Sequence, residues 1–327
     1  MRALTLADAL TERGASPSFL APPFVAELLD RFAGPGIGRV DGADLELAAF
    51  AEAAADAASG FDAVVFDHFR LGAREHYRIA GGRPSLAVDD LADRRLGVDM
   101  VLDVGPARRA ADYEGLVEPE ATLLLGPGYA LVRPEFSARR EAAMARRGGE
   151  TVGRALVSLG LTDVGGVTAR IVGRLLPRLG EAGLDVVLGG AAPSLAEMQR
   201  LAARDPRITL HVETPHMDQL CAQADLAVGA GGSSTWERCV IGLPTVLVVL
   251  ADNQEPGARA VAAAGAAEAV DARGDDFEAA FDRAFLGLMR SPERRGRMAR
   301  AAAALCDGEG AGRAAEALLQ MCARGTD

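Results

Sequence analysis

The sequence contains no lysine, and all 35 of its basic residues are arginine. This absence excludes a Walker-type phosphate loop, a Schiff-base enzyme and a pyridoxal phosphate enzyme, because each depends on a lysine side chain. The net charge is −11, and no helix-length segment carries a stripe of basic residues. Nucleic acid and anionic membranes are therefore not expected partners, and any phosphate site must be local.

Cysteine and long apolar runs are also scarce. The four cysteines are widely spaced, with no Cys-x-x-Cys pair and no histidine at zinc-finger distance. We therefore expect reduced thiols, no metal site, no cofactor and a cytoplasmic location. No apolar run reaches the length of a membrane span, and residues 1–14 are amphipathic rather than arranged like a signal peptide. The sequence predicts a soluble protein.

Strand-like apolar runs alternate with helix-like segments along most of the chain. The runs in the first half are Ala63–Phe66, Ser85–Val88, Met100–Leu102 and Thr122–Leu125. Those in the second half are Arg154–Leu159, Leu184–Leu188, Ile208–Val212, Leu226–Val228 and Thr245–Leu250. Alternation of this kind predicts an α/β protein with parallel sheets and helices on both faces.

A chain of 327 residues is long enough for two domains. We predict a doubly wound, Rossmann-like domain over residues 1–134, a linker over 135–150 and a second such domain over 151–327, facing each other across a cleft. Residues 2–13 form an amphipathic helical pattern that no strand precedes. We therefore expect either that the N-terminal domain lacks its first strand or that Met1 is not the natural start.

Polar residues follow many of the predicted strands. Ligands of such folds bind beyond the carboxyl ends of the strands, so these residues are the candidate site. The segments that follow strands are Asp67-His68, Asp89-Asp90, Ser158–Asp163, Gly229–Glu237 and Asp252–Gln254.

The most informative of these segments is the turn rich in glycine, serine and threonine. Its glycines would let the backbone approach a ligand, and its hydroxyls would add donors at the start of a helix, which together favour a diphosphate. Glu237 lies one turn further along and suits neutral hydroxyls such as a ribose diol. The same pattern also suits an ordinary capped helix after a strand. The residues expected to bind diphosphate are Gly231, Gly232, Ser233, Ser234 and Thr235.

Over nearly its whole length the chain resembles the nucleotide-sugar hydrolases of pseudaminic acid biosynthesis, which cleave UDP from a 2,4-diacetamido-2,4,6-trideoxy-β-L-altropyranose. The resemblance is carried by residues 1–10, Val65-Phe-Asp-His-Phe, Val88-Asp-Asp-Leu-Ala-Asp-Arg94, residues 124–136, Gly229–Cys239 and Asp252-Asn253-Gln254. It implies a GT-B fold like that of the lipid II glycosyltransferase. It also implies that the C-terminal domain holds UDP.

The resemblance implies further contacts with the sugar and the phosphates. Asn253 would hold the sugar or the attacking water, and Gln254 would bind sugar hydroxyls or acetamido groups. Thr162 and Asp163 belong to the loop that matches the family's Gly-Gly-Thr/Ser-Asp loop near phosphate. Leu161 replaces a glycine in that loop.

The family's proposed general base is absent from this chain. It is the histidine of a Gly-x-Gly-His-x-x-Arg loop, and because Arg2 matches the arginine of that loop, the histidine would lie upstream of Met1. His68, Asp89 and Asp90 remain as candidates for the base, with Asp67 able to orient His68 and the aspartate pair able instead to cap the loop that follows. Phe69 replaces a tyrosine of the family pattern.

We expect a metal-independent mechanism in which the helix start at Gly232–Thr235 stabilises the departing diphosphate. The first hypothesis is hydrolysis of a UDP-linked 2,4-diacetamido-2,4,6-trideoxy sugar. The alternatives are a GT-B glycosyltransferase with a UDP-sugar donor and a UDP-sugar-binding protein that has lost catalysis. The sequence does not determine the oligomeric state or the stereochemistry of the sugar.

Overall fold

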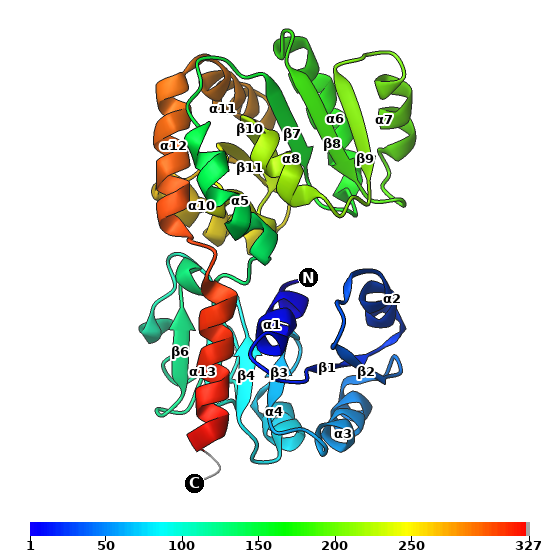
Figure 1. Cartoon of the computed structure of the whole chain (residues 1–327), viewed down its shortest axis with the longest axis vertical. Helices are drawn as coiled ribbons and strands as arrows, with labels where there is room; N and C mark the ends of the chain where they lie inside the picture. Colours follow the sequence, from blue (N-terminus) through cyan, green and yellow to red (C-terminus); the bar gives the residue numbers. More distant parts are fainter. Residues whose placement is uncertain (325–327) are drawn as a thin grey trace. The chain divides into compact units, whose positions relative to one another are not determined.

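The computed structural model describes residues 1–324 and divides the chain into two compact units (Figure 1). One unit comprises Met1–Val132 together with the chain from Glu309 onward, and the other comprises Arg133–Gly308. Each unit is an α/β structure with a parallel sheet.

The second unit contains a six-stranded parallel sheet in the order β12-β11-β10-β7-β8-β9. Numbered within the unit, this is the doubly wound order, which reverses between its first and fourth strands, β7 and β10. Every residue of β11 is buried, which means that both faces of this central strand are covered. The strands are β7 (Arg154–Ser158), β8 (Gly183–Leu188), β9 (Ile208–Val212), β10 (Leu226–Ala230), β11 (Thr245–Val249) and β12 (Glu268–Asp271).

Helices connect these strands and bury their apolar faces against the sheet. The core combines aliphatic strand residues such as Val157 and Val248 with Phe281 and Phe285, all of which are fully buried. The helices are α5 (Pro134–Ala145), α6 (Val167–Leu175), α7 (Leu195–Ala202), α8 (Met217–Gln223), α9 (Ser234–Val240), α10 (Glu255–Ala263), α11 (Phe277–Arg290) and α12 (Pro292–Leu305), with short 3₁₀ turns η3 (Val164–Gly166), η4 (Leu176–Arg178) and η5 (Asp252–Gln254).

The first unit contains a four-stranded parallel sheet in the order β3-β4-β5-β6 and a separate parallel pair, β1-β2. Its first element is a helix, α1. The strands are β1 (Ser18–Ala21), β2 (Gly38–Asp41), β3 (Val64–Phe66), β4 (Ser85–Val88), β5 (Met100–Asp103) and β6 (Thr122–Leu125). The helices are α1 (Arg2–Thr11), α2 (Pro23–Phe32), α3 (Leu47–Ala58), α4 (Ala73–Ala80) and α13 (Gly310–Arg324), with 3₁₀ turns η1 (Ala110–Tyr113) and η2 (Pro127–Tyr129).

The structure confirms the predicted α/β class and the predicted strands, whose ends differ from the sequence expectation by one or two residues. β1, β2 and β12 were not predicted. Their four-residue segments carry few buried side chains, so they lack the apolar run that identifies the other strands.

The observed division of the chain differs from the predicted one at two places. The C-terminal helix α13 is grouped with the first unit because Ala314, Ala315 and Leu318 bury their side chains in one cluster with Leu6 and Leu10 of α1. Figure 1 shows the two helices side by side.

The predicted linker over residues 135–150 is largely the helix α5, which is part of the second unit. Arg140 and Arg147 attach it there by donating hydrogen bonds to backbone carbonyls near the ends of α8, α9 and α12.

Within residues 1–324 no helix has both the length and the apolar character needed to cross a bilayer.

His76 in α4 gives the first unit a pH-dependent stability. Its side chain is fully buried, its Nδ1 accepts a hydrogen bond from the backbone N–H of Gly97, and its ring lies 4.5 Å from that of Phe66. Burial lowers its pKa from 6.5 to about 4, and the positive charge of Arg94 acts in the same direction. The neutral ring is therefore the form that folds.

We expect the free energy of unfolding to be unaffected by the titration of His76 above about pH 6.5. As the pH falls from 6.5 toward 4, protonation of His76 in the unfolded chain should lower this free energy by up to about 3 kcal/mol. His76→Gln retains an acceptor for Gly97 but does not titrate in this range. Denaturant unfolding at pH 7 and pH 4.5 should show a smaller loss of unfolding free energy in the variant. Equal losses in both proteins would contradict this account.

Candidate functional site

Three of the predicted segments lie together at one edge of the sheet in the second unit. Ser158 ends β7, the turn Gly231–Thr235 follows β10, and η5 follows β11. These strands are neighbours, and parallel strands present their carboxyl ends at the same edge. The edge between β7 and β10 is the point where the strand order reverses, which is where ligands of doubly wound sheets bind.

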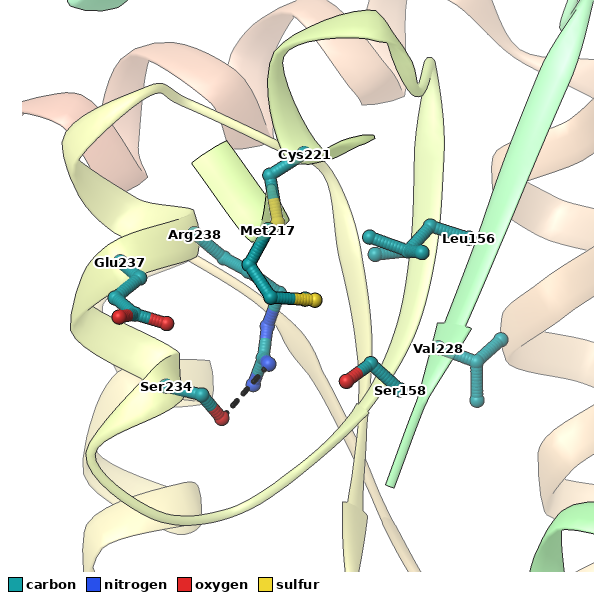
Figure 2. A pocket seen from close by; sticks show the side chains of 9 residues that line it. Leu156, Ser158, Met217, Cys221, Val228, Ser234, Glu237 and Arg238 are labelled. Atoms are coloured by element: carbon teal, nitrogen blue, oxygen red, sulfur yellow. Dashed lines mark hydrogen bonds between the residues drawn. The ribbon is translucent and has the colours of Figure 1, made fainter. Parts of the chain in front are cut away.

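A small pocket lies at this switch point (Figure 2). Its polar lining comes from Ser158, Ser234, Glu237 and Arg238, and its apolar lining comes from β7, β10 and α8, including Leu156, Met217, Cys221 and Val228. Within residues 1–324 no three His, Cys, Asp or Glu side chains form a group that would hold a metal ion.

Gly229 near the end of β10 and the two glycines of the turn have different surroundings. A Cβ on Gly229 would lie 2.5 Å from Cζ of Arg238, so this glycine makes room for a side chain of the protein itself. A Cβ on Gly231 would lie 3.2 Å from the Cβ of Gln254, whereas Gly232 borders open space. The expectation that all three bring the backbone toward a ligand is therefore corrected for Gly229.

The side chains of the turn differ in exposure. Gly232 and Ser233 are exposed, Ser234 is half-buried, and Thr235 is buried. The Oγ1 of Thr235 accepts a weak hydrogen bond of 3.4 Å from the N–H of Gly232. The following helix α9 has only seven residues. A full positive charge, that of Arg238, lies directly against two hydroxyls of this turn.

Arg238 was not among the predicted site residues. Its side chain is buried, and it donates hydrogen bonds to the carbonyl of Ala230 (2.8 Å), Oγ of Ser234 (3.1 Å) and Oγ1 of Thr235 (3.3 Å). Burial lowers the pKa of this guanidinium. A signal existed in the sequence, because the position after Glu237 falls on the inward side of a helix that follows a glycine-rich strand end.

Glu237 is held by Arg133, the residue that precedes α5. The Nη2 and Nε of Arg133 lie 3.0 Å and 3.1 Å from Oε1 of Glu237, and the guanidinium also covers the ring of Phe136 at 5.1 Å. Burial raises the pKa of the Glu237 carboxyl, and Arg133 counteracts that effect. No side chain or backbone donor of residues 1–324 bonds Oε2, which leaves this oxygen to accept from a ligand hydroxyl.

Asn253 and Gln254 lie in η5, next to the turn. Asn253 is exposed, whereas Gln254 is half-buried and its Oε1 accepts a hydrogen bond of 2.9 Å from the N–H of Leu250. The side-chain NH₂ of Gln254 is therefore the part left for a ligand. The structure brings Gln254 against Gly231, two residues that are 23 positions apart in the sequence.

The loop after β7 corrects the prediction for Asp163. This side chain is fully buried, and its two oxygens accept hydrogen bonds from the backbone N–H groups of Thr168 (2.9 Å) and Ser194 (3.0 Å). Its carboxylate is occupied in joining the start of α6 to the segment before α7, so it does not contact a ligand. Thr162 is exposed and remains a candidate.

Leu161 does not need to be glycine. The residues of this loop with positive φ are Gly160 (+100°) and Asp163 (+45°), while Leu161 lies outside that region. Its carbonyl accepts from the N–H of Gly189 and its side chain is 48% exposed. The replacement therefore adds an exposed apolar side chain without backbone strain.

The candidate residues of the first unit gather at the ends of β3 and β4. Arg2 is bonded to Asp67 (2.7 Å) and Asp90 (2.9 Å), and its guanidinium lies 5.7 Å from the ring of Phe69. Burial raises the pKa of Asp90, against the effect of Arg2. The carboxylate of Asp67 is thus engaged by Arg2, and the expectation that it orients His68 is wrong.

His68 is unsuited to act as a general base in this arrangement. Its Nδ1 accepts a hydrogen bond from the N–H of Arg70 (3.1 Å), so the neutral ring carries its hydrogen on Nε2. Burial lowers its pKa, and the charges of Arg70 and Arg94 lower it further, which favours that neutral form. The half-buried ring stacks on Phe50 and offers an N–H donor rather than an acceptor.

Asp89 is also a structural residue. It is buried, and its oxygens accept from the N–H of Ala92 (2.8 Å), Nη1 of Arg94 (2.9 Å) and the hydroxyl of Tyr113 (2.9 Å). The alternative expectation that it caps the following loop is therefore confirmed. The expectation that it binds substrate is corrected, because no oxygen is left accessible.

Comparison with known proteins relates the second unit to glycosyltransferases. Residues 188–312 match the Glycosyltransferase family 28 C-terminal domain. The chain is 28% identical over 153 residues to the spore coat polysaccharide biosynthesis protein SpsG of Bacillus subtilis, which covers 46% of this chain and 44% of that protein. It is 35% identical over 150 residues to the UDP-N-acetylglucosamine–N-acetylmuramyl-(pentapeptide) pyrophosphoryl-undecaprenol N-acetylglucosamine transferase of Salinibacter ruber, covering 44% and 39%.

A third relative is the UDP-2,4-diacetamido-2,4,6-trideoxy-beta-L-altropyranose hydrolase of Campylobacter jejuni. It is 23% identical over 207 residues, covering 63% of this chain and 72% of that enzyme. The matches to the first two relatives span less than half of their length. Over 98% of this chain and 95% of the other, the fold is similar to that of Acinetobacter baumannii MurG, with a TM-score of 0.68 and 18% identity. The fold is that of the GT-B glycosyltransferases, with two Rossmann-like domains.

The role assigned to Asp163 predicts a loss of stability in its variant. Asp163→Ala leaves two backbone N–H groups without their acceptor, and we expect the unfolding free energy to fall by about 2–4 kcal/mol in urea unfolding. The neighbouring variant Thr162→Ala, at an exposed position, should change it by no more than about 0.5 kcal/mol. A stable Asp163→Ala protein with lost nucleotide affinity would restore the ligand-binding role.

Proposed function

We propose that this chain binds a UDP-linked sugar and cleaves the bond between the sugar C1 and the diphosphate, with water as the acceptor. The substrate proposed first is a UDP-2,4-diacetamido-2,4,6-trideoxy sugar of nonulosonic acid synthesis. The observation that carries the nucleotide part is the group of side chains at the switch point, where hydroxyl donors and a carboxylate with an unbonded oxygen lie together beside the small pocket. The similarity to the Campylobacter hydrolase supports the sugar and the reaction.

The diphosphate and the ribose of UDP need opposite hydrogen-bonding groups from the protein. A diphosphate needs donors, which the backbone of Gly232 and the hydroxyls of Ser233 and Ser234 supply. A ribose diol needs an acceptor, which Oε2 of Glu237 supplies. The donors and the acceptor lie within six consecutive residues, Gly232–Glu237, so the phosphate and the ribose of one nucleotide would each find a suitable group there.

The residues proposed for the sugar are neutral or already charge-paired. Asn253 is exposed beside the turn and would hold the sugar or the water through its amide, while the NH₂ of Gln254 would meet an acetamido or hydroxyl oxygen. In the first unit, the Nε2–H of His68 and the carboxylate of Asp90 stay candidate ligand groups, one as a donor and the other as an acceptor. We assign no general base, because His68 and Asp89 are engaged in ways that oppose that role and the carboxylate of Asp90 is paired with Arg2.

Glycosyl transfer is the second candidate. The relative with the highest identity of the three is a transferase, at 35% over 150 residues. Phe69 leaves 51% of its surface exposed at the strand edge of the first unit, where an acceptor would find an apolar contact. A protein that binds the UDP-sugar without turning it over is the third candidate.

The reaction is tested by following UDP release with phosphorus NMR from UDP-2,4-diacetamido-2,4,6-trideoxy-β-L-altropyranose, without an acceptor. We expect steady release, and we expect Asn253→Ala to slow turnover by about 10²-fold or more while the affinity for UDP stays unchanged. Asp252→Asn, on the same turn with a fully exposed side chain, serves as the control. Release that begins only when an acceptor is added would establish the transferase instead, and tight binding without release would establish the binding protein.

Glu237 provides an independent test of how the nucleotide is oriented. We expect Glu237→Gln to weaken UDP binding by about 10-fold in calorimetric titration and to leave the weaker binding of 2′,3′-dideoxy-UDP unchanged, because the lost bonds are those to the ribose hydroxyls. Glu135→Gln removes the same charge from an exposed position nearby and should change neither affinity. An equal loss for both nucleotides would contradict the ribose assignment.

A further inference from the structure

We propose that Arg238 is the positioning residue that prepares the Gly231–Thr235 turn for a diphosphate, by orienting the hydroxyls of Ser234 and Thr235 and by placing a buried positive charge beneath them. This inference rests on the proposed function, since it concerns how the same pocket selects its anion. Arg238 itself is buried, so it acts through the hydroxyls rather than by touching the ligand. The half-buried Ser234 is the hydroxyl that would meet the ligand, while Thr235, which is buried as well, braces the turn by accepting from the N–H of Gly232.

The guanidinium of Arg238 is buried and, in the described part of the chain, has no carboxylate partner. Within residues 1–324 no carboxylate oxygen lies within ion-pair distance of the Arg238 guanidinium, and its Nε has no hydrogen-bond partner. The adjacent carboxylate, Glu237, is bonded to Arg133 instead. A buried charge without a counter-charge is costly to the fold, and a bound anion would supply the missing partner.

Arg295, another buried arginine of this unit, is satisfied differently. Arg295 is 1% exposed and donates only to backbone carbonyls, namely those of Leu288, Met289, Gly149 and Glu150. A carbonyl oxygen can only accept a hydrogen bond, so it cannot in turn donate one to a ligand. Two of the three partners of Arg238 are hydroxyls, which both accept and donate.

The hydrogen-bond direction at these hydroxyls follows from the chemistry of arginine. A guanidinium has donors and no acceptor, so Ser234 Oγ and Thr235 Oγ1 must accept from it. Thr235 Oγ1 also accepts from the N–H of Gly232. The hydroxyl hydrogens are then free to point away from the guanidinium, as donors polarised by a full charge behind them.

Strand β10 leaves room for the Arg238 guanidinium because it has a glycine, Gly229, at the point of contact. The Cβ of any residue other than glycine at position 229 would lie 2.5–2.9 Å from Cζ, Nη1 and Nη2 of Arg238, and these are the three heavy atoms nearest to it. The φ of Gly229 is not in the left-handed region, so the backbone alone does not require glycine there. Figure 2 shows the guanidinium extending toward Ser234 and Ser158, at the polar side of the pocket.

The test compares UDP with uridine, because only UDP carries the diphosphate. In calorimetric titrations we expect Arg238→Gln to weaken UDP binding by about 10- to 100-fold and uridine binding by less than about 3-fold. Gly229→Ala keeps the charge but displaces the guanidinium, and we expect it to weaken UDP selectively as well. Arg295→Gln, the matched control, should lower the melting temperature without changing the ratio of the two affinities.

The outcomes separate this inference from the proposed function. If the wild-type protein binds UDP but Arg238→Gln and Gly229→Ala bind it equally well, or lose UDP and uridine in the same proportion, the positioning role is overturned and the nucleotide site stands. If the wild-type protein binds neither UDP nor uridine, the proposed function fails and this inference fails with it. Selective loss of UDP in the variants supports both.

Discussion

Burial of both faces of a parallel sheet is the constraint that most shapes this protein. Strands such as β11 and β8 are covered on both sides, so they are apolar along almost their whole length. Polar chemistry can then reach solvent only where the strands end. The reversal of strand order between β7 and β10 opens one such place, and Ser158, the Gly231–Thr235 turn and η5 all meet there.

Arginine has to perform every task of a basic residue in this chain, and the structure uses it in distinct ways. Arg140, Arg147 and Arg295 fasten segments by donating to backbone carbonyls, which a planar guanidinium with several donors does well. Arg2 and Arg133 hold carboxylates at the two candidate sites. Arg238 holds hydroxyls, and this difference in partner is what connects it to ligand binding rather than to docking.

The candidate carboxylates and histidines show why residue type alone does not assign a role. Asp89 and Asp90 are neighbours in sequence, yet one is buried beneath Tyr113 and Arg94 while the other extends to Arg2. Asp163 follows a strand as a ligand residue would, but its oxygens are used on two backbone N–H groups. His68 lies beside Asp67 in sequence and is bonded to the backbone of Arg70 instead.

The sequence by itself determined the α/β class, the positions of the longer strands and the turn after β10, because these depend on local apolar runs and on glycine. Tertiary structure alone decided that α13 packs with α1, that Gly229 makes room for Arg238, and which oxygen of Glu237 is left unbonded. Those outcomes depend on contacts between residues far apart in the chain and on which lone pair or N–H remains after folding. The amino-acid sequence shows which donors and acceptors the chain has, but which of them bond to each other depends on the folded structure.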